Sequence, residues 1–167
     1  MGDSGPTGAA REGPASETLQ NQERVGETND GFEAGVCFVG EADRRLVFSG
    51  AHFSLWRARL GAVEEIRGDK AGIGYRRAPG EAPFNDIEID LAPGDAFYLT
   101  TDGLIEQIGG ARRLSFGRKR FAEILAQRGG RPMAEQREAL TAALAHYQGA
   151  EQRRDDVTVL GFAPLAI

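Results

Sequence analysis

The sequence contains little of what several common classes of protein depend on. It has one cysteine, Cys37, and no apolar run approaching the roughly 20 residues of a membrane span. A single thiol forms no internal disulfide, and the apolar neighbours of Cys37 predict a buried, unreactive side chain. The N-terminus also lacks the apolar centre of a secretion signal. We therefore expect a soluble, cytoplasmic protein.

Concentrated positive charge is lacking too. The 167 residues carry 20 Lys and Arg against 25 Asp and Glu, a net charge of -5. Nucleic-acid binding needs a concentrated basic face, so this balance argues against a nucleic-acid partner. One local basic cluster is typical of a solvated helix start and comprises Arg112, Arg113, Arg118, Lys119 and Arg120.

What the sequence does contain suits one folded domain, since 41% of its residues are hydrophobic and 27% are charged. Residues 1–30 differ, because Leu19 and Val25 are their only large aliphatic residues after Met1. Such a segment buries too little apolar area to offset its ordering entropy. We expect residues 1–30 to be a disordered segment or linker, with room for a short helix at 17–24, and residues 31–167 to be the folded portion.

The folded portion reads as strands, then two helices, then a last strand. Alternating and β-branched apolar residues predict strands at 32–39, 46–49, 53–59, 63–67, 84–91, 96–101 and 155–162. Helical spacing predicts one helix over 121–128 and another from Pro132 to Gly149. This order predicts an α+β fold with a mostly antiparallel sheet.

Two acidic positions lie where a buried strand meets a loop. Asp102 follows the apolar run at 96–101, and Asp155 precedes the run at 157–162. A carboxylate beside an apolar strand costs desolvation energy unless it is paired or binds a cation, and Mg²⁺ and Mn²⁺ prefer oxygen ligands. However, Asp-Gly is also a common turn dipeptide, and Asp155 could pair with Arg153 or Arg154. The pattern alone leaves both interpretations open.

Four ordered segments carry a resemblance to a known family. They are GDAFYLTTDGLIEQ at 94–107, RRDDVTVLGF at 153–162, DGFEAGVCFV at 30–39 and LVFSGAHFSLW at 46–56, with SFGRKRF at 115–121 in the linking helices. The chain resembles the C-terminal part of the PPM family of metal-dependent Ser/Thr protein phosphatases, in its bacterial SpoIIE branch. The resemblance covers about residues 30–164.

This resemblance implies a partial PPM-type β-sandwich flanked by helices, with the N-terminal part of the domain missing. It implies that Asp102 and Asp155 are ligands in a binuclear Mn²⁺ or Mg²⁺ site, and that Gly103 and Asp156 support them. It implies no catalytic residue beyond the metal ligands. The reaction then resembles two-metal hydrolysis without a covalent enzyme intermediate.

The chain departs from the family in its first part. The family has an upstream strand with an Asp, followed by an Asp-Gly whose Asp bridges both metals. Asp3 is followed by Ser4, and Asp30-Gly31 matches the start of a later strand. The resemblance therefore implies about half of a metal site, with weakened metal affinity and activity.

Three hypotheses about what the chain does follow from these expectations. The first is a hydrolase module that removes phosphate from Ser or Thr of a bacterial signalling protein, such as a phosphorylated anti-sigma-factor antagonist. The second is a catalytically inactive phosphatase-like domain that binds a signalling partner. The third is a non-functional truncated product whose exposed sheet surface would make it prone to associate. His52 is either a general acid near the site or a strand-end histidine with a structural hydrogen bond.

Overall fold

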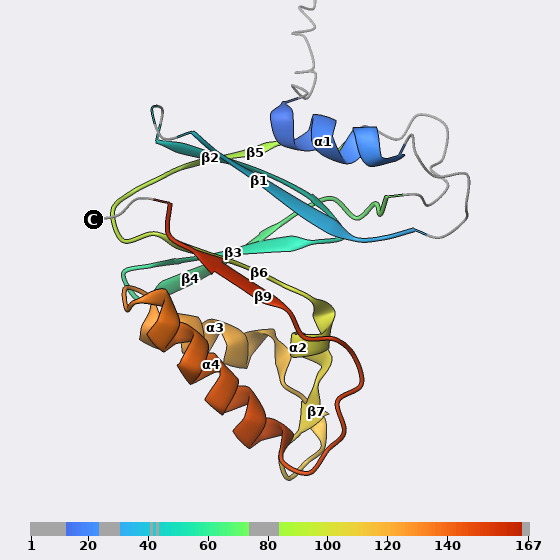
Figure 1. Cartoon of the computed structure of the whole chain (residues 1–167), viewed down its shortest axis with the longest axis vertical. Coiled ribbons are helices and arrows are strands. Elements are labelled where there is room, and N and C mark those ends of the chain that lie inside the picture. The colour runs from blue at the N-terminus through green and yellow to red at the C-terminus, as the bar shows by residue number, and fades with distance from the viewer. Residues whose placement is uncertain (1–12, 24–30, 41, 43, 74–83, 165–167) are drawn as a thin grey trace, which may run out of the picture. The chain divides into compact units, whose positions relative to one another are not determined.

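The computed structural model describes residues 13–23, 31–40, 42, 44–73 and 84–164 (Figure 1). The chain divides into two compact units whose segments alternate along the sequence. The first unit contains α1 (Pro14–Glu23), β1 (Ala34–Gly40), β2 (Arg45–Ala51) and most of β5 (Ile87–Asp90). The second unit contains β3 (Ser54–Arg59), β4 (Ala62–Arg67), β6 (Ala96–Thr100), α2 (Asp102–Glu106), β7 (Ile108–Gly109), β8 (Leu114–Ser115), α3 (Gly117–Arg128), α4 (Met133–Gln148) and β9 (Val159–Phe162).

The first unit is a three-stranded sheet, in the order β1-β2-β5, that carries α1. Strands β1 and β2 are antiparallel, with Ala34 opposite Ala51. A small core forms around four buried apolar residues, Leu19, Ala51, Ile73 and Phe84.

Helix α1 lies within the segment expected to be a disordered stretch or linker, and overlaps the short helix considered there. It forms because Ala15, Ser16 and Leu19 are buried in the first unit. Its first turn is capped by a distant residue, since the backbone N–H of Ser16 donates to the Asp86 carboxylate at 2.6 Å. The remainder of that expectation, residues 1–12 and 24–30, lies outside the described residues.

The second unit is built on a four-stranded sheet in the order β4-β3-β6-β9, and each neighbouring pair is antiparallel. The β3–β4 connection is a two-residue turn in which Leu60 and Gly61 have φ of 50° and 81°. Both values suit the twist of a tight hairpin, and glycine adopts such a φ without strain.

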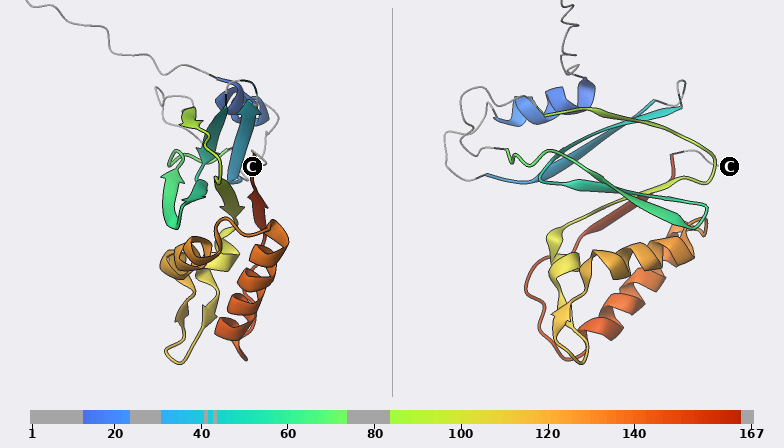
Figure 2. Two further views of the ribbon diagram at one scale, coloured as in Figure 1. Left: turned by 90° about the vertical axis from the view of Figure 1, so that its left-hand side faces the viewer. Right: turned by 180° about the vertical axis from the view of Figure 1, so that it is seen from behind.

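One face of this sheet carries the helices of the second unit (Figure 2, right). Trp56 meets Phe121 of α3 edge-on, with ring centroids 5.3 Å apart and an interplanar angle of 81°. The buried cluster on this face is made of Trp56, Ala58, Ala96, Tyr98, Leu104, Phe116, Phe121, Leu125 and Leu144. None of the helices in the described part of the chain is long and apolar enough to cross a membrane.

The predicted α+β class with antiparallel sheets is confirmed, whereas several boundaries differ. The last strand begins at Val159 rather than at Asp155, because residues 155–158 form the loop that leads into it. Helix α2 and the β7–β8 hairpin were not predicted. Both are short, and Asp-Gly at the start of α2 is as typical of a turn as of a helix.

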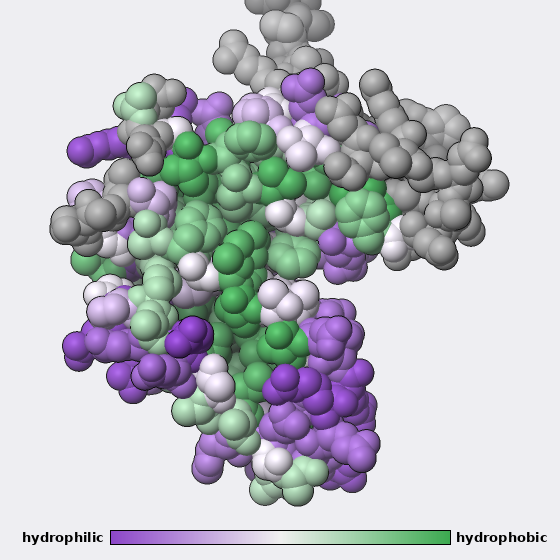
Figure 3. Space-filling model, in the orientation of Figure 1, coloured by the Kyte–Doolittle hydropathy of each residue, from purple (hydrophilic) through white to green (hydrophobic). Residues whose placement is uncertain are grey.

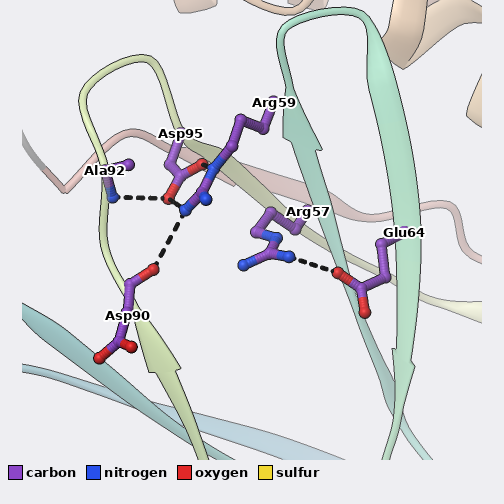
Figure 4. A network of polar contacts seen from close by, with 6 residues as sticks. All are labelled: Arg57, Arg59, Glu64, Asp90, Ala92 and Asp95. Carbon is purple, nitrogen blue, oxygen red and sulfur yellow. Dashed lines mark hydrogen bonds and ion pairs between the residues drawn. The ribbon is translucent and has the colours of Figure 1, made fainter.

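The turn before β6 holds a buried carboxylate (Figure 4). The Asp95 side chain is 1% exposed and accepts two hydrogen bonds from the Arg59 guanidinium, at 2.5 and 2.6 Å. The backbone N–H of Ala92 donates to the same carboxylate at 2.9 Å, and Arg59 also donates to the Asp90 carbonyl at 3.1 Å. This network fixes the turn that enters β6.

Candidate functional site

Asp102 is the first residue of α2 and follows the end of β6 directly. The preceding residue, Thr101, has extended backbone angles, so the chain changes from strand to helix between these two residues. The Asp102 side chain is exposed. Within the described ranges it takes part in no hydrogen bond or ion pair, so both carboxylate oxygens face solvent.

Asp155 lies in the loop that leads into β9, and it is also exposed. The backbone N–H of Asp156 donates to one Asp155 carboxylate oxygen at 2.7 Å. This local bond limits the rotation of the Asp155 side chain and leaves its second oxygen without a partner among the residues that the structure describes.

Thr101 joins the two acidic segments. Its backbone N–H donates to the Thr158 carbonyl at 3.1 Å, and its hydroxyl donates to the Asp156 carbonyl at 3.0 Å. The same hydroxyl accepts the backbone N–H of Thr158 at 3.0 Å. These bonds continue the β6–β9 ladder, in which Thr100 pairs with Val159. Asp102 and Asp155 therefore lie on two segments that are hydrogen-bonded to each other.

Gly103 lets the start of α2 approach the second acidic segment closely. A Cβ atom at this position would collide with the Asp156 carbonyl oxygen and crowd the Asp155 peptide. A larger residue would have to displace the loop that carries Asp155. Gly103 thus packs closely against the Asp155–Asp156 backbone, and its supporting role at a metal site stays a prediction.

These donors fit a hard dication in part. Asp102 and Asp155 offer carboxylate oxygens, which Mg²⁺ and Mn²⁺ prefer, and a Mg²⁺ site often uses only one or two carboxylates and several waters. Across the described ranges there is no group of three or more His, Cys, Asp or Glu residues that could hold a metal ion. The described residues therefore offer two candidate metal donors, fewer than the group of three that a fuller site would need.

Gln107 was not predicted as part of this region, although it is buried at the end of α2. Its side-chain amide donates to the Gln152 carbonyl at 3.2 Å and to the Ile108 carbonyl at 2.9 Å. Gln107 thus ties the far end of α2 to the chain that precedes Asp155. A glutamine five residues after an Asp gives no sequence signal for such a role.

The two other residues considered for chemistry lie in the first unit. Cys37 is half-buried rather than buried as predicted. Its partial burial still raises the pKa of the thiol to about 12, so this side chain stays protonated and weakly nucleophilic. The His52 ring contacts the Lys70 carbonyl, and its Nδ1 lies 3.5 Å from the Glu33 carboxylate. These contacts within its own unit favour the structural interpretation of His52.

Comparison with known families identifies the chain. The family profile described as Stage II sporulation protein E (SpoIIE) matches residues 15–163, which include both acidic segments. The chain belongs to the SpoIIE family. The family resemblance in the sequence is thereby confirmed, and the match also includes most of α1.

Solved structures similar to this SpoIIE-family chain include phosphatase domains. The SiaA-PP2C domain of Pseudomonas aeruginosa is 38% identical, with a TM-score of 0.77 over 87% of this chain and 57% of that chain. The RsbU and RsbW domains of a Mycobacterium tuberculosis protein are 20% identical, with a TM-score of 0.65 over 86% of this chain and 38% of theirs. The manganese-presoaked SpoIIE phosphatase domain of Bacillus subtilis is 14% identical, with a TM-score of 0.60 over 92% of this chain and 75% of its own.

The SpoIIE-family chain is shorter than these relatives. It spans 57% of the SiaA-PP2C domain and 38% of the Mycobacterium tuberculosis chain. The comparison with curated proteins gives no match. The second and third structures are below 25% identity and therefore show the fold alone.

Proposed function

We propose that this chain is a Ser/Thr phosphoprotein phosphatase module that supplies part of a binuclear Mn²⁺ or Mg²⁺ centre. Its substrate is phosphoserine or phosphothreonine in a bacterial signalling protein, such as a phosphorylated anti-sigma-factor antagonist, and its location is the cytoplasm. One observation carries the proposal. In a SpoIIE-family chain, Thr101 links two segments whose Asp102 and Asp155 carboxylates are exposed.

The relatives support the metal and the substrate class. The SpoIIE phosphatase domain of Bacillus subtilis was studied with manganese, and its name describes a cell fate determinant. The catalytic domain of the serine/threonine phosphatase PstP was solved with 2 manganese ions, and its fold is similar to this chain with a TM-score of 0.53. Phosphatase activity and manganese are what the descriptions of these two relatives have in common.

The roles of the residues follow from their positions. Asp102 and Asp155 hold the cation through carboxylate oxygens, and Asp156 supports Asp155 through its backbone N–H. Thr101 orients both segments, and Gly103 keeps them close. When bound, the metal ions supply positive charge that stabilises the phosphoryl oxygens during hydrolysis. No side chain of this chain is assigned as a nucleophile or as a general base.

One observation favours a second function, a catalytically inactive domain that binds a signalling partner. The described residues contain two candidate metal donors but no group of three. A site with few carboxylates holds a hydrated dication weakly, so a domain of this kind could keep its fold and its partner without catalysis.

Hydrolysis of p-nitrophenyl phosphate distinguishes these functions. The 167-residue chain is assayed with and without Mn²⁺, beside Asp102→Asn, Asp155→Asn and the control Glu106→Gln. Glu106 is an exposed carboxylate at the end of the same short helix, so it matches Asp102 in charge and setting. The phosphatase proposal expects Mn²⁺-dependent hydrolysis that both Asp variants lose and that Glu106→Gln keeps.

Mn²⁺ binding, measured by calorimetry on the same proteins, separates the site from the activity. Binding that depends on Asp102 and Asp155 without hydrolysis would favour the inactive binding domain. Hydrolysis that survives both substitutions or a chelator would contradict the assignment of these residues as metal ligands.

A further inference from the structure

A groove lies between α4 and β9 in the second unit. Its volume is about 640 Å³, within the range of known binding pockets. Buried Leu104 and Leu144 lie among its lining residues, together with Met133 and Leu140 of α4 and Val159 of β9. Most of the groove is thus formed by side chains of the type found in a protein core.

The groove is open because α4 is poorly covered. Of the 16 residues of α4, only Gln136 and Leu144 are buried among those that the structure describes. The space-filling view shows apolar side chains over β9 and toward α4, between polar flanks (Figure 3). Exposed apolar surface of this kind marks an interaction site.

The charged residues that line the groove are all positive. Arg137 lines it near the start of α4, and Arg153 lines it beside Gln148, at the end of α4. None of the lining residues is acidic. In the described part of the chain, neither arginine forms an ion pair, and Arg153 donates only a 3.4 Å hydrogen bond to Gln148. The groove is therefore mostly apolar, with Gln136, Thr141 and Gln148 among its lining residues, and it carries one arginine toward each end of α4.

We propose that this groove binds an amphipathic α-helix of another polypeptide, with apolar residues on one face and acidic residues near both ends. A helix fits because α4, one wall of the groove, is itself a helix about 24 Å long. Helices bind such grooves through apolar residues at i, i+3, i+4 and i+7. The two arginines lie roughly 16 Å apart along α4, so a lipid with one anionic headgroup would satisfy only one of them.

The stretches of this sequence outside the described ranges do not have the residue pattern of an amphipathic helix. The residues outside the described ranges are 1–12, 24–30, 41, 43, 74–83 and 165–167. No two large aliphatic residues in these stretches have helical spacing. These stretches therefore do not supply the helix, and the proposed occupant is a separate polypeptide. This docking site does not depend on the proposed phosphatase activity.

Fluorescence anisotropy with synthetic helices tests the proposal. The probe is a labelled peptide of about 18 residues, with leucines at helical spacing and glutamates near both ends, and the matched peptide carries lysines in place of the glutamates. The 167-residue chain is expected to bind the glutamate peptide roughly tenfold more tightly at low salt. Equal binding of the two peptides would overturn the proposal.

Substitutions locate the binding surface. Ala145 lines the groove and is exposed, so Ala145→Trp should fill the groove and weaken peptide binding roughly tenfold without disturbing the core. Arg137→Glu and Arg153→Glu should each reduce the preference for glutamate. The control Arg128→Glu, on α3 outside the groove, should leave binding unchanged. Circular dichroism and urea unfolding confirm that each variant is folded.

Two further outcomes would overturn the proposal. One is peptide binding that Ala145→Trp and both arginine variants leave unchanged, which would place the peptide elsewhere. The other is self-association of the chain, seen by sedimentation and abolished by Ala145→Trp, which would assign the groove to a second copy.

Discussion

Strand β6 has an aspartate at each end, and the two side chains differ in exposure and in hydrogen bonding. Asp95 precedes the strand, is 1% exposed and is held by Arg59 and by the backbone N–H of Ala92. Asp102 follows the strand and is exposed, without a hydrogen bond or ion pair to any described residue. The protein satisfies one carboxylate completely and leaves the other open to solvent.

The pKa of Asp95 shows how the protein satisfies a buried carboxylate. Burial by itself raises this pKa, but the hydrogen bonds from Arg59 and Ala92, together with the positive charges of Arg59 and Arg57, lower it below the ordinary value. Such a carboxylate is structural. The contrast separates a carboxylate whose oxygens are used inside the protein from one that keeps free oxygens, and only the second can offer them to a cation.

Removal of the buried charge should have the largest effect. Asp95→Asn leaves Arg59 without its partner and should lower the free energy of unfolding by about 3 kcal/mol, because breaking a buried ion pair is strongly destabilising. Asp102→Asn should leave it unchanged to within about 0.5 kcal/mol, as for a surface substitution. Urea unfolding of both variants measures the difference. Equal losses would remove the distinction between the two residues.

Acid should gradually remove the stabilisation that the charged Asp95 carboxylate contributes to the folded state. The pKa of Asp95 is lower in the folded state than in the unfolded chain, so its stabilisation is complete above about pH 3.9 and is lost as the pH falls through the folded value. The stability advantage of the wild type over Asp95→Asn should therefore shrink on acidification below that pH. Urea titrations at a series of pH values would show this. An advantage that does not change with pH would contradict the charged pair.

A methyl group at Gly103 should act on the other end of the strand. Gly103→Ala forces the Asp155–Asp156 segment to move, at a cost of about 1–3 kcal/mol in unfolding free energy, because the Cβ would overlap the Asp156 carbonyl. It should also weaken Mn²⁺ binding, which Ala at the half-buried Gly117, where a Cβ would meet no other atom, should not. Gly117 has φ of 83°, so this control carries its own backbone strain and is compared by metal binding alone.

Bound Mn²⁺ should have the smallest effect on the free energy of unfolding. Mn²⁺ at ten times its dissociation constant should stabilise the folded wild type by about 1.4 kcal/mol, since ligands that bind only the native state stabilise it. Asp102→Asn should lose this gain, and Asp95→Asn, compared at its own lower melting temperature, should keep it. Thermal unfolding with and without Mn²⁺ measures both. A gain that survives Asp102→Asn would place the ion elsewhere.

The sequence predicted the acidic positions but not what joins them. Asp102 and Asp155 were found because each adjoins an apolar run. The role of Thr101 could not be found, because its hydroxyl bonds to residues 55 and 57 positions away, and this proximity exists only once β6 and β9 pair. Their ligand roles remain predictions.

The secondary structure was likewise predicted only in part. Strands with clear alternation were predicted near their observed positions, since half-burial imposes a period of two. Helix α1 was not predicted as part of the folded portion, because its apolar face is limited to Ala15 and Leu19 and its cap is Asp86, 70 residues away from Ser16. Its stability comes from contacts that local sequence does not encode.

The order of strands in the second unit has a consequence for control of the site. Asp102 extends from β6, which has a neighbour on each side, whereas Asp155 leads into β9, the outermost strand of that sheet as described. Outer strands open more readily than inner ones, so spontaneous fraying of β9 would separate the two carboxylates without disturbing the core. β9 is also a wall of the groove. A helix bound in the groove would contact β9 and stabilise its pairing with β6. The bound partner would thereby determine how long the segments that carry Asp102 and Asp155 stay hydrogen-bonded to each other.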